Sequence, residues 1–186
     1  MNFLSIWMGN PPSNKLIENV KSNLKKLDID GKYVFITDQK LNIRSQKIIT
    51  IDLNGYLEKV FADFPWIENL YKTIPTDGYW HFMRSDIVRF HYMSQNENTL
   101  YMDFDIKLLK RISLDTPAFA NKVNTVDYCL FYNDRELETM EEILKISLAR
   151  IKTKSSYIFK RNWIYRTINK RFNFDKIDSK YFIHGV

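Results

Sequence analysis

Two patterns of apolar positions follow each other along the chain. One is typical of buried strands and the other of helices with one apolar face. Short apolar runs indicate buried strands at residues 3–7, 33–36, 47–53, 99–102 and 125–131. Stretches in which apolar residues recur every three or four positions predict helices at residues 14–27, 56–64, 66–72, 79–93, 135–151 and 156–172. Strands that alternate with helices favour an α/β domain with a mainly parallel sheet flanked by helices.

Several predicted strands end at residues whose side chains could face a ligand. In parallel sheets, ligands bind at the carboxyl ends of the strands, near the place where the strand order reverses. The residues at or beside such ends are Trp7, Asp38, Asp103 and Asn133. We therefore expect these four residues to lie along one edge of the sheet.

The predicted strand 99–102 is followed directly by Asp103-Phe104-Asp105. Carboxylates two residues apart at the end of a strand point to the same side of the sheet. Because two unpaired like charges would be costly there, we expect a cation between them. Oxygen ligands suit Mg²⁺ or Mn²⁺, and such an ion commonly carries the phosphates of a nucleotide. The pattern predicts a divalent metal site at Asp103 and Asp105; the alternative is a solvated pair of carboxylates in a loop at the end of the strand.

A polar triplet, Arg84, Asp86 and Arg89, interrupts the otherwise aromatic and aliphatic helix just upstream. Asp86 and Arg89 are three residues apart on one helix face, so both can contact the same ligand. Arginine suits a phosphate because its guanidinium can donate two parallel hydrogen bonds. The alternative is an internal Asp86–Arg89 ion pair that supports the helix. For Arg84, a surface charge is the alternative.

These motifs together resemble those of the Asp-x-Asp glycosyltransferases of the GT-A type. The family pattern is Ser-Asp, two apolar residues and Arg, then a turn, then Tyr, an apolar residue and Asp-x-Asp, which residues 85–89 and 101–105 follow. Residues 6–12 (Ile-Trp-Met-Gly-Asn-Pro-Pro) and 35–38 (Phe-Ile-Thr-Asp) resemble the family's opening strand and the end of its second strand. The group includes capsular polysaccharide transferases, initiating mannosyltransferases and the catalytic domains of clostridial glucosylating toxins.

The resemblance implies a compact GT-A-like domain that binds a nucleotide sugar together with Mn²⁺ or Mg²⁺. It implies that Asp105 binds the metal directly, that Asp103 contacts the ribose and the metal, and that His184 completes the coordination. A disordered terminus is the alternative for His184. Catalytic roles are implied for Asp86, Arg89 and Asp105. The implied donor-binding residues are Trp7, which would stack on a uracil ring, and Thr37, Asp38, Arg84, Asp86, Arg89 and Asp103.

Other interpretations of these positions stay open. Core packing is the alternative for Trp7, and a helix cap or turn is the alternative for Thr37 and Asp38. The chain departs from the family pattern at residues 95–99, where Gln-Asn-Glu-Asn-Thr replaces a Gly-Gly turn. Asparagine can replace glycine there because it tolerates a left-handed backbone. The chain is also short for the family, which leaves the acceptor open more than the donor.

Charge is distributed unevenly along the chain. Residues 145–180 contain eleven Lys or Arg and two Asp or Glu, a local net charge of +9. Because the whole chain carries +6, the remainder carries −3. The predicted helix 156–172 interleaves aromatic and cationic residues, which suits a nucleic-acid backbone or an anionic membrane surface. This pattern predicts a polyanionic acceptor, either a modified DNA base or an envelope glycan or lipid. A helix that packs its aromatic residues on the sheet is the alternative.

The 186 residues, 45% of them apolar, fit one domain with a donor-binding core (1–134) and a helical, basic C-terminal part (135–186). No apolar run is long enough for a transmembrane helix, and the first residues lack the features of a signal peptide. Cys129 is the single cysteine, which excludes a disulfide framework and predicts a reducing cytoplasm. The small size favours a compact bacterial or phage enzyme.

Three functions remain open from the sequence. The first is a metal-dependent glycosyltransferase that uses a UDP-linked sugar; retention of the anomeric configuration is implied by the resemblance alone. The second is a phosphatase of the haloacid-dehalogenase type, whose Asp-x-Asp also follows an apolar strand, although here the motif lies mid-chain and lacks the usual Gly-Thr or Gly-Val after it. The third is a non-catalytic nucleic-acid or membrane-binding domain, which the presence of both motifs argues against.

Overall fold

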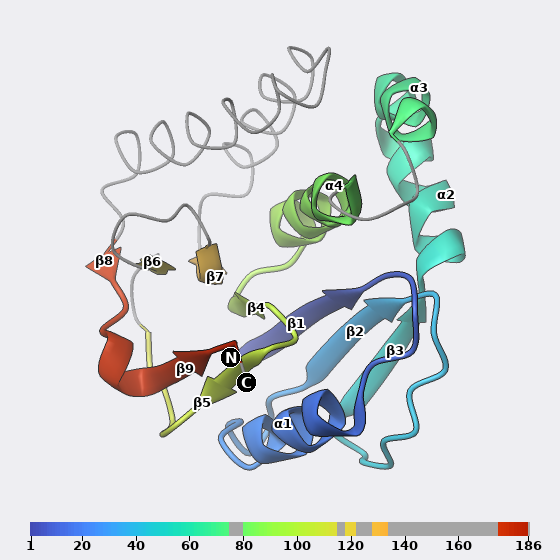
Figure 1. Ribbon diagram of the computed structural model, residues 1–186. Coiled ribbons are helices and arrows are strands. Elements are labelled where there is room, and N and C mark those ends of the chain that lie inside the picture. Colours follow the sequence, from blue (N-terminus) through green and yellow to red (C-terminus); the bar gives the residue numbers. More distant parts are fainter. Residues whose placement is uncertain (75–79, 115–117, 122–127, 134–174, 186) are drawn as a thin grey trace.

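The computed structural model describes residues 1–74, 80–114, 118–121, 128–133 and 175–185. Its centre is a seven-stranded sheet with the strand order β3-β2-β1-β4-β7-β6-β8 (Figure 1). The strands are β1 (Asn2–Trp7), β2 (Tyr33–Thr37), β3 (Ile48–Asp52), β4 (Thr99–Met102), β6 (Ala118–Asn121), β7 (Tyr128–Asn133) and β8 (Asp175–Lys176). The predicted α/β architecture is therefore confirmed, and four of the five predicted strands lie within two residues of their observed bounds.

Four neighbouring strands of this sheet, β3, β2, β1 and β4, run parallel. Their register places Trp7 opposite Thr37, so the carboxyl ends of β1 and β2 meet at one edge. Strand β7 runs antiparallel to β4 and pairs Asn133 with Thr99, the first residue of β4. The expectation that Asn133 joins the other strand-end residues is therefore wrong, because an antiparallel strand ends at the opposite edge of the sheet.

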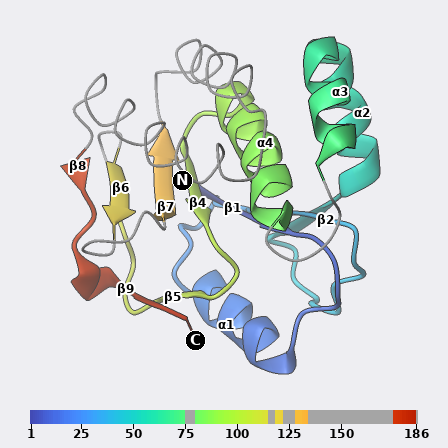
Figure 2. The same ribbon diagram turned by 45° about the horizontal axis from the view of Figure 1, so that its top comes forward.

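Helices cover both faces of the parallel strands (Figures 1 and 2). Helix α1 (Asn14–Leu24) lies on one face, and its N-cap is Ser13, whose Oγ accepts a hydrogen bond from the Leu16 amide. The other face carries α2 (Leu53–Asp63), α3 (Pro65–Thr73) and α4 (Trp80–Gln95). Pro65 is the first residue of α3, one residue before the predicted start of this helix, because proline is tolerated in the first turn of a helix. The predicted helices 135–151 and 156–172 lie outside the described residues.

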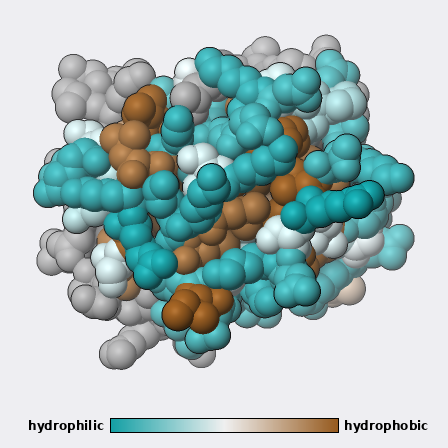
Figure 3. Space-filling model, turned by 90° about the horizontal axis from the view of Figure 1, so that it is seen from below, coloured by the Kyte–Doolittle hydropathy of each residue, from teal (hydrophilic) through white to brown (hydrophobic). Residues whose placement is uncertain are grey.

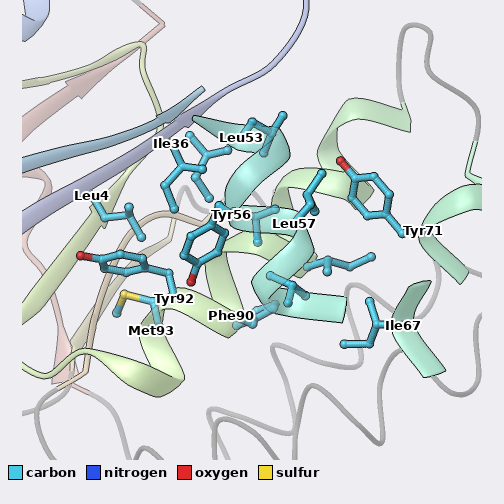
Figure 4. Packing of buried hydrophobic residues seen from close by; sticks show 14 of the residues in the cluster. Leu4, Ile36, Leu53, Tyr56, Leu57, Ile67, Tyr71, Phe90, Tyr92 and Met93 are labelled. Carbon is cyan, nitrogen blue, oxygen red and sulfur yellow. The ribbon is translucent and has the colours of Figure 1, made fainter. Parts of the chain in front are cut away.

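Alternate residues of the strands fill two separate cores, one on each face of the sheet. Leu4 and Ile36 point to the side of α2–α4, where they pack among the apolar residues shown in Figure 4. Phe3 and Phe35 point to the side of α1. Burial on both faces explains why these strands read as continuous apolar runs rather than as alternating ones.

A second, two-stranded sheet joins two segments that are far apart in the sequence. Strand β5 (Ile106–Leu108) pairs antiparallel with β9 (Phe182–His184), and Ile106 lies opposite His184. A short 3₁₀ helix, Ser179–Tyr181, precedes β9. The C-terminal residues are therefore ordered against the segment that follows β4, and the alternative of a disordered terminus is wrong for residues 175–185.

The turn before β4 agrees with the sequence prediction. Asn98 has φ of 50°, which is the left-handed conformation that was expected of an asparagine in place of glycine.

Within the described ranges, no helix is both long and apolar enough to span a bilayer. The face seen in Figure 3 is largely hydrophilic, with separate apolar patches between polar side chains. Exposed apolar residues of this kind are common on folded proteins.

The buried Tyr33 generates a prediction about stability at alkaline pH. Burial raises its pKa from 10.0 to about 12, although hydrogen bonds with Ser5 and Asn23 oppose the rise. Between those two values the unfolded chain loses the Tyr33 proton and the folded chain keeps it, so the free energy of unfolding falls as the pH rises. The free energy of unfolding is measured by urea titration at pH 9 and at pH 11. From the lower to the higher pH, we expect it to fall by about 1 kcal/mol less in Tyr33→Phe than in the wild type. An equal fall in the wild type and in Tyr33→Phe would show that the Tyr33 hydroxyl is not buried as described.

Candidate functional site

Asp103 and Asp105 lie in a tight turn between β4 and β5. The Ile106 amide donates a hydrogen bond to the Asp103 carbonyl oxygen over 3.0 Å and closes this turn. Phe104 is buried in the core on the α1 side, whereas both aspartates are partly exposed. The sequence prediction of two carboxylates at the end of a strand on one side of the sheet is therefore close to what the structure places there.

His184 completes a group of three metal-capable side chains. Because β9 sets His184 opposite Ile106, its imidazole lies beside Asp105, with 3.4 Å between Nε2 and Oδ2. One ligand atom each from Asp103, Asp105 and His184 lies within 4.8 Å of the others. Two carboxylates and an imidazole are a donor set that fits a divalent cation, and the three residues are the ones expected from the sequence.

Tyr101 holds the first of these carboxylates from inside the fold. Its hydroxyl donates a hydrogen bond of 2.6 Å to Asp103 Oδ1, and its ring is buried. Burial, reinforced by the Asp103 charge, raises the pKa of Tyr101 well above its ordinary value. The hydroxyl therefore stays protonated at neutral pH and remains a hydrogen-bond donor that fixes the orientation of Asp103.

The α4 motif reaches the same place through Tyr101. Asp86 and Arg89 form an ion pair in which both side chains are buried. The Arg89 guanidinium lies over the Tyr101 ring, with 4.6 Å from its central carbon to the ring centroid. The Ser85 side chain also acts on the Tyr101 hydroxyl, where it opposes the rise of the pKa. The internal Asp86–Arg89 pair that the sequence left as an alternative is thus present, and it packs one side chain away from Asp103.

Trp7 and Asp38 lie at the same edge of the sheet. The Trp7 ring is 5.0 Å from Phe104, the residue between the two aspartates, and its Nε1 donates to the Asn10 carbonyl oxygen over 2.7 Å. The Gly9 amide lies 3.2 Å from each carboxylate oxygen of Asp38. Asp38 therefore holds the glycine turn that follows β1, and the partly exposed Trp7 lies between that turn and the Asp-Phe-Asp segment.

Thr37 and Arg84 contact backbone groups and a side chain of neighbouring elements. Thr37 is buried, and its Oγ1 accepts a hydrogen bond of 3.0 Å from the Gln39 amide. The Arg84 guanidinium donates to the Ile74 carbonyl oxygen over 2.6 Å and lies 4.6 Å from the Tyr71 ring centroid. The structure therefore places Arg84 against the end of α3, where it links α3 to α4.

Four buried polar residues on the α1 side of the sheet were not predicted from the sequence. They are Ser5, Asn19, Asn23 and Tyr33. The signal that could have identified two of them is their position: Asn19 and Asn23 are four residues apart, on the face that α1 turns toward the core. Asparagine is rarely buried without a specific hydrogen-bond partner, so such a pair indicates a backbone that needs to be held.

No family model and no curated protein matches this chain. Several solved structures match it in fold. The PaToxG glycosyltransferase matches with a TM-score of 0.63 and 14% identity, over 92% of this chain and 69% of that one. A transferase mutant matches with a TM-score of 0.58 and 10% identity, over 98% of this chain and 93% of that one. The apo glycosyltransferase GlyE of Streptococcus pneumoniae matches with a TM-score of 0.50 and 11% identity, over 96% of this chain but 45% of its own.

At these identities the likeness establishes the fold. The chain has the α/β, GT-A-like fold of glycosyltransferases, as the sequence motifs predicted. The two aspartates follow β4 at the edge where parallel strands of such folds present their carboxyl ends to a ligand.

The buried Asp86–Arg89 pair generates a prediction about stability. Asp86→Asn removes the charge that faces the buried guanidinium, so we expect the free energy of unfolding to fall by about 3 kcal/mol in urea titrations. The matched control is Glu68→Gln, the same carboxylate-to-amide change in an exposed ion pair with Lys72, which should cost less than about 1 kcal/mol. Similar losses in the two variants would show that Asp86 and Arg89 do not form a buried pair.

Proposed function

We propose that this protein is a metal-dependent glycosyltransferase that moves a sugar from a UDP-sugar to a large polyanionic acceptor. The observation that carries the proposal is the group of Asp103, Asp105 and His184, in a fold shared with glycosyltransferases. The fold favours this function over the phosphatase and over a purely binding role.

The three side chains would hold Mn²⁺ or Mg²⁺. Such an ion, when bound, neutralises negative charge on the diphosphate leaving group of a nucleotide sugar. The chain's own contribution is to orient the ligands: Tyr101 fixes Asp103, and the β5–β9 pairing sets His184 beside Asp105. Preorganised ligands of this kind need little rearrangement when the donor arrives.

Donor recognition would use the residues along the same edge of the sheet. Trp7 is partly exposed beside Phe104, which supports stacking of its indole on the uracil ring. Asp38 and Thr37 would set the position of the base or ribose through the turn that they stabilise. Asp86 and Arg89 would meet the donor sugar, because their pair packs on Tyr101, next to Asp103. Arg84 would act indirectly, through its contact with α3.

The chemistry breaks the bond between the anomeric carbon and the diphosphate and forms a bond to an acceptor hydroxyl. We propose that the configuration is retained and that the leaving phosphate oxygen takes the acceptor proton. This would let the reaction proceed without a protein carboxylate as general base. The transition state is positive on the sugar and negative on the leaving group.

A direct test of the activity is UDP release from a panel of UDP-sugars, with and without Mn²⁺. Many transferases hydrolyse their donor slowly when no acceptor is present, so the sugar can be identified first. We expect one UDP-sugar to release UDP only when Mn²⁺ is supplied. Hydrolysis of a simple phosphate monoester without UDP release would support the phosphatase instead.

The metal assignment generates a prediction for Asp105→Asn. The substitution keeps the side-chain volume and removes the charge, so UDP release should fall more than about a hundredfold while the melting temperature stays nearly unchanged. Asp30→Asn is the matched control, because Asp30 is exposed in the loop before β2, at the opposite edge of the sheet. Full activity of purified Asp105→Asn would exclude Asp105 as a metal ligand.

The acceptor proposal depends on the predicted basic helix 156–172, which lies outside the described residues. We predict that replacing its cationic residues with glutamine reduces transfer to the acceptor and flattens its salt dependence, because fewer counterions are released. Donor hydrolysis should stay nearly normal. The residues are Lys160, Arg161, Arg166, Lys170 and Arg171.

Salt-dependent binding to duplex DNA would identify a nucleic-acid acceptor, and binding to anionic lipid vesicles would identify an envelope acceptor. Binding to neither at low salt would mean that the charge of this segment serves only solvation.

A further inference from the structure

We propose that four buried polar side chains, Ser5, Asn19, Asn23 and Tyr33, position the Asp103–Asp105 segment for metal binding. The inference rests on the proposed function, since it concerns the geometry of the same site. None of the four belongs to the metal-capable group. They act through the backbone on both sides of the two aspartates and are therefore positioning residues.

Asn19 holds the backbone on either side of Asp105. Its Nδ2 donates to the carbonyl oxygen of Phe104 over 3.1 Å and to that of Ile106 over 2.6 Å. Both of these groups are acceptors, so the amide must turn its NH₂ group toward them. Asn19 is 5% exposed, which shields these hydrogen bonds from competition by water. One side chain thus fixes to α1 the peptide unit that joins Phe104 to Asp105 and the one that joins Ile106 to Lys107.

Asn23 acts on β5 as a residue of a neighbouring strand would. Its Nδ2 donates to the Ile106 carbonyl oxygen over 2.7 Å, and its Oδ1 accepts from the Leu108 amide over 2.8 Å. In a parallel ladder, one residue likewise bonds the carbonyl and the amide of two partners that are two positions apart. The side-chain amide therefore satisfies one edge of β5, and β9 pairs with the other.

Ser5 and Tyr33 hold the other end of the segment. The Ser5 hydroxyl donates to the Met102 carbonyl oxygen over 2.6 Å, immediately before Asp103. Its Oγ lies 3.1 Å from the Tyr33 hydroxyl, and the Asn23 side chain acts on the same hydroxyl by lowering its pKa. Ser5 with Tyr33 therefore holds the backbone before Asp103, while Asn19 and Asn23 hold the backbone after it; we call these four side chains the buried network.

The network has an energetic reason as well as a geometric one. The backbone of residues 102–108 lies against the apolar core on the α1 side, where an unpaired carbonyl or amide costs about 1–3 kcal/mol. Apolar side chains at these positions would leave such groups unpaired, so the segment would shift toward water. Because His184 is placed by pairing with Ile106, a shift of β5 would also separate His184 from Asp105.

The test compares Asn19→Leu and Ser5→Ala with a control that loses a buried hydrogen bond elsewhere. The control is Tyr56→Phe, whose hydroxyl lies 2.9 Å from His91 Nδ1 in the core on the opposite face of the sheet. Mn²⁺ affinity is measured by calorimetry with saturating UDP, well below the melting temperature of each variant. We expect Asn19→Leu and Ser5→Ala to bind Mn²⁺ about tenfold more weakly, and Tyr56→Phe to lose stability but keep the wild-type affinity.

A second readout does not depend on the metal. Hydrogen exchange of peptides that span residues 103–108 should accelerate in Asn19→Leu and Asn23→Leu but not in Tyr56→Phe, because only the first two release this backbone. Wild-type Mn²⁺ affinity in folded Asn19→Leu and Ser5→Ala would overturn the positioning role while leaving the proposed function intact. Wild-type protein that binds no Mn²⁺ would overturn the proposed function, and unchanged exchange at residues 103–108 would overturn the network itself.

Discussion

The site depends on holding two carboxylates, Asp103 and Asp105, close together at the end of a parallel strand. Two unit charges about 4 Å apart repel by about 4 kcal/mol at an effective dielectric near 20. Without other contacts, this repulsion would move the two carboxylates apart. Hydrogen bonds and packing from the rest of the fold therefore have to hold the segment in place. A cation that binds between them converts this repulsion into attraction. The same constraint therefore explains both the hydrogen bonds around the loop and its suitability for a divalent metal.

The restraint comes from both faces of the sheet. On the side of α4, Tyr101 fixes Asp103 and is covered by Arg89, whose charge is paired with Asp86. On the side of α1, the buried network that contains Asn19 and Asn23 holds the backbone around Asp105. Hydrogen bonds are directional, so they fix a geometry that apolar packing alone would leave adjustable. The two faces together set where the carboxylates and His184 can meet.

Local patterns in the sequence predicted the parallel strands and the position of the acidic pair. Strand 99–102 was predicted with its observed bounds, because an apolar run that ends in two aspartates is visible without any partner. The pairing of β5 with β9 was not predicted, because three-residue strands show no periodicity and their partners are more than seventy residues apart. Asn133 was misplaced because strand direction depends on the chain path. The buried network was missed because its members are polar residues whose roles follow from contacts across the sheet.

The most direct test of the metal site is a crystal structure of the protein with Mn²⁺ and UDP, with the metal located by its anomalous scattering. We expect one strong anomalous peak at direct-coordination distance from Asp103, Asp105 and His184, with the UDP diphosphate bound to the same ion and the uracil ring against Trp7. An anomalous peak bound away from these three side chains, or UDP bound with no metal between the aspartates, would contradict it.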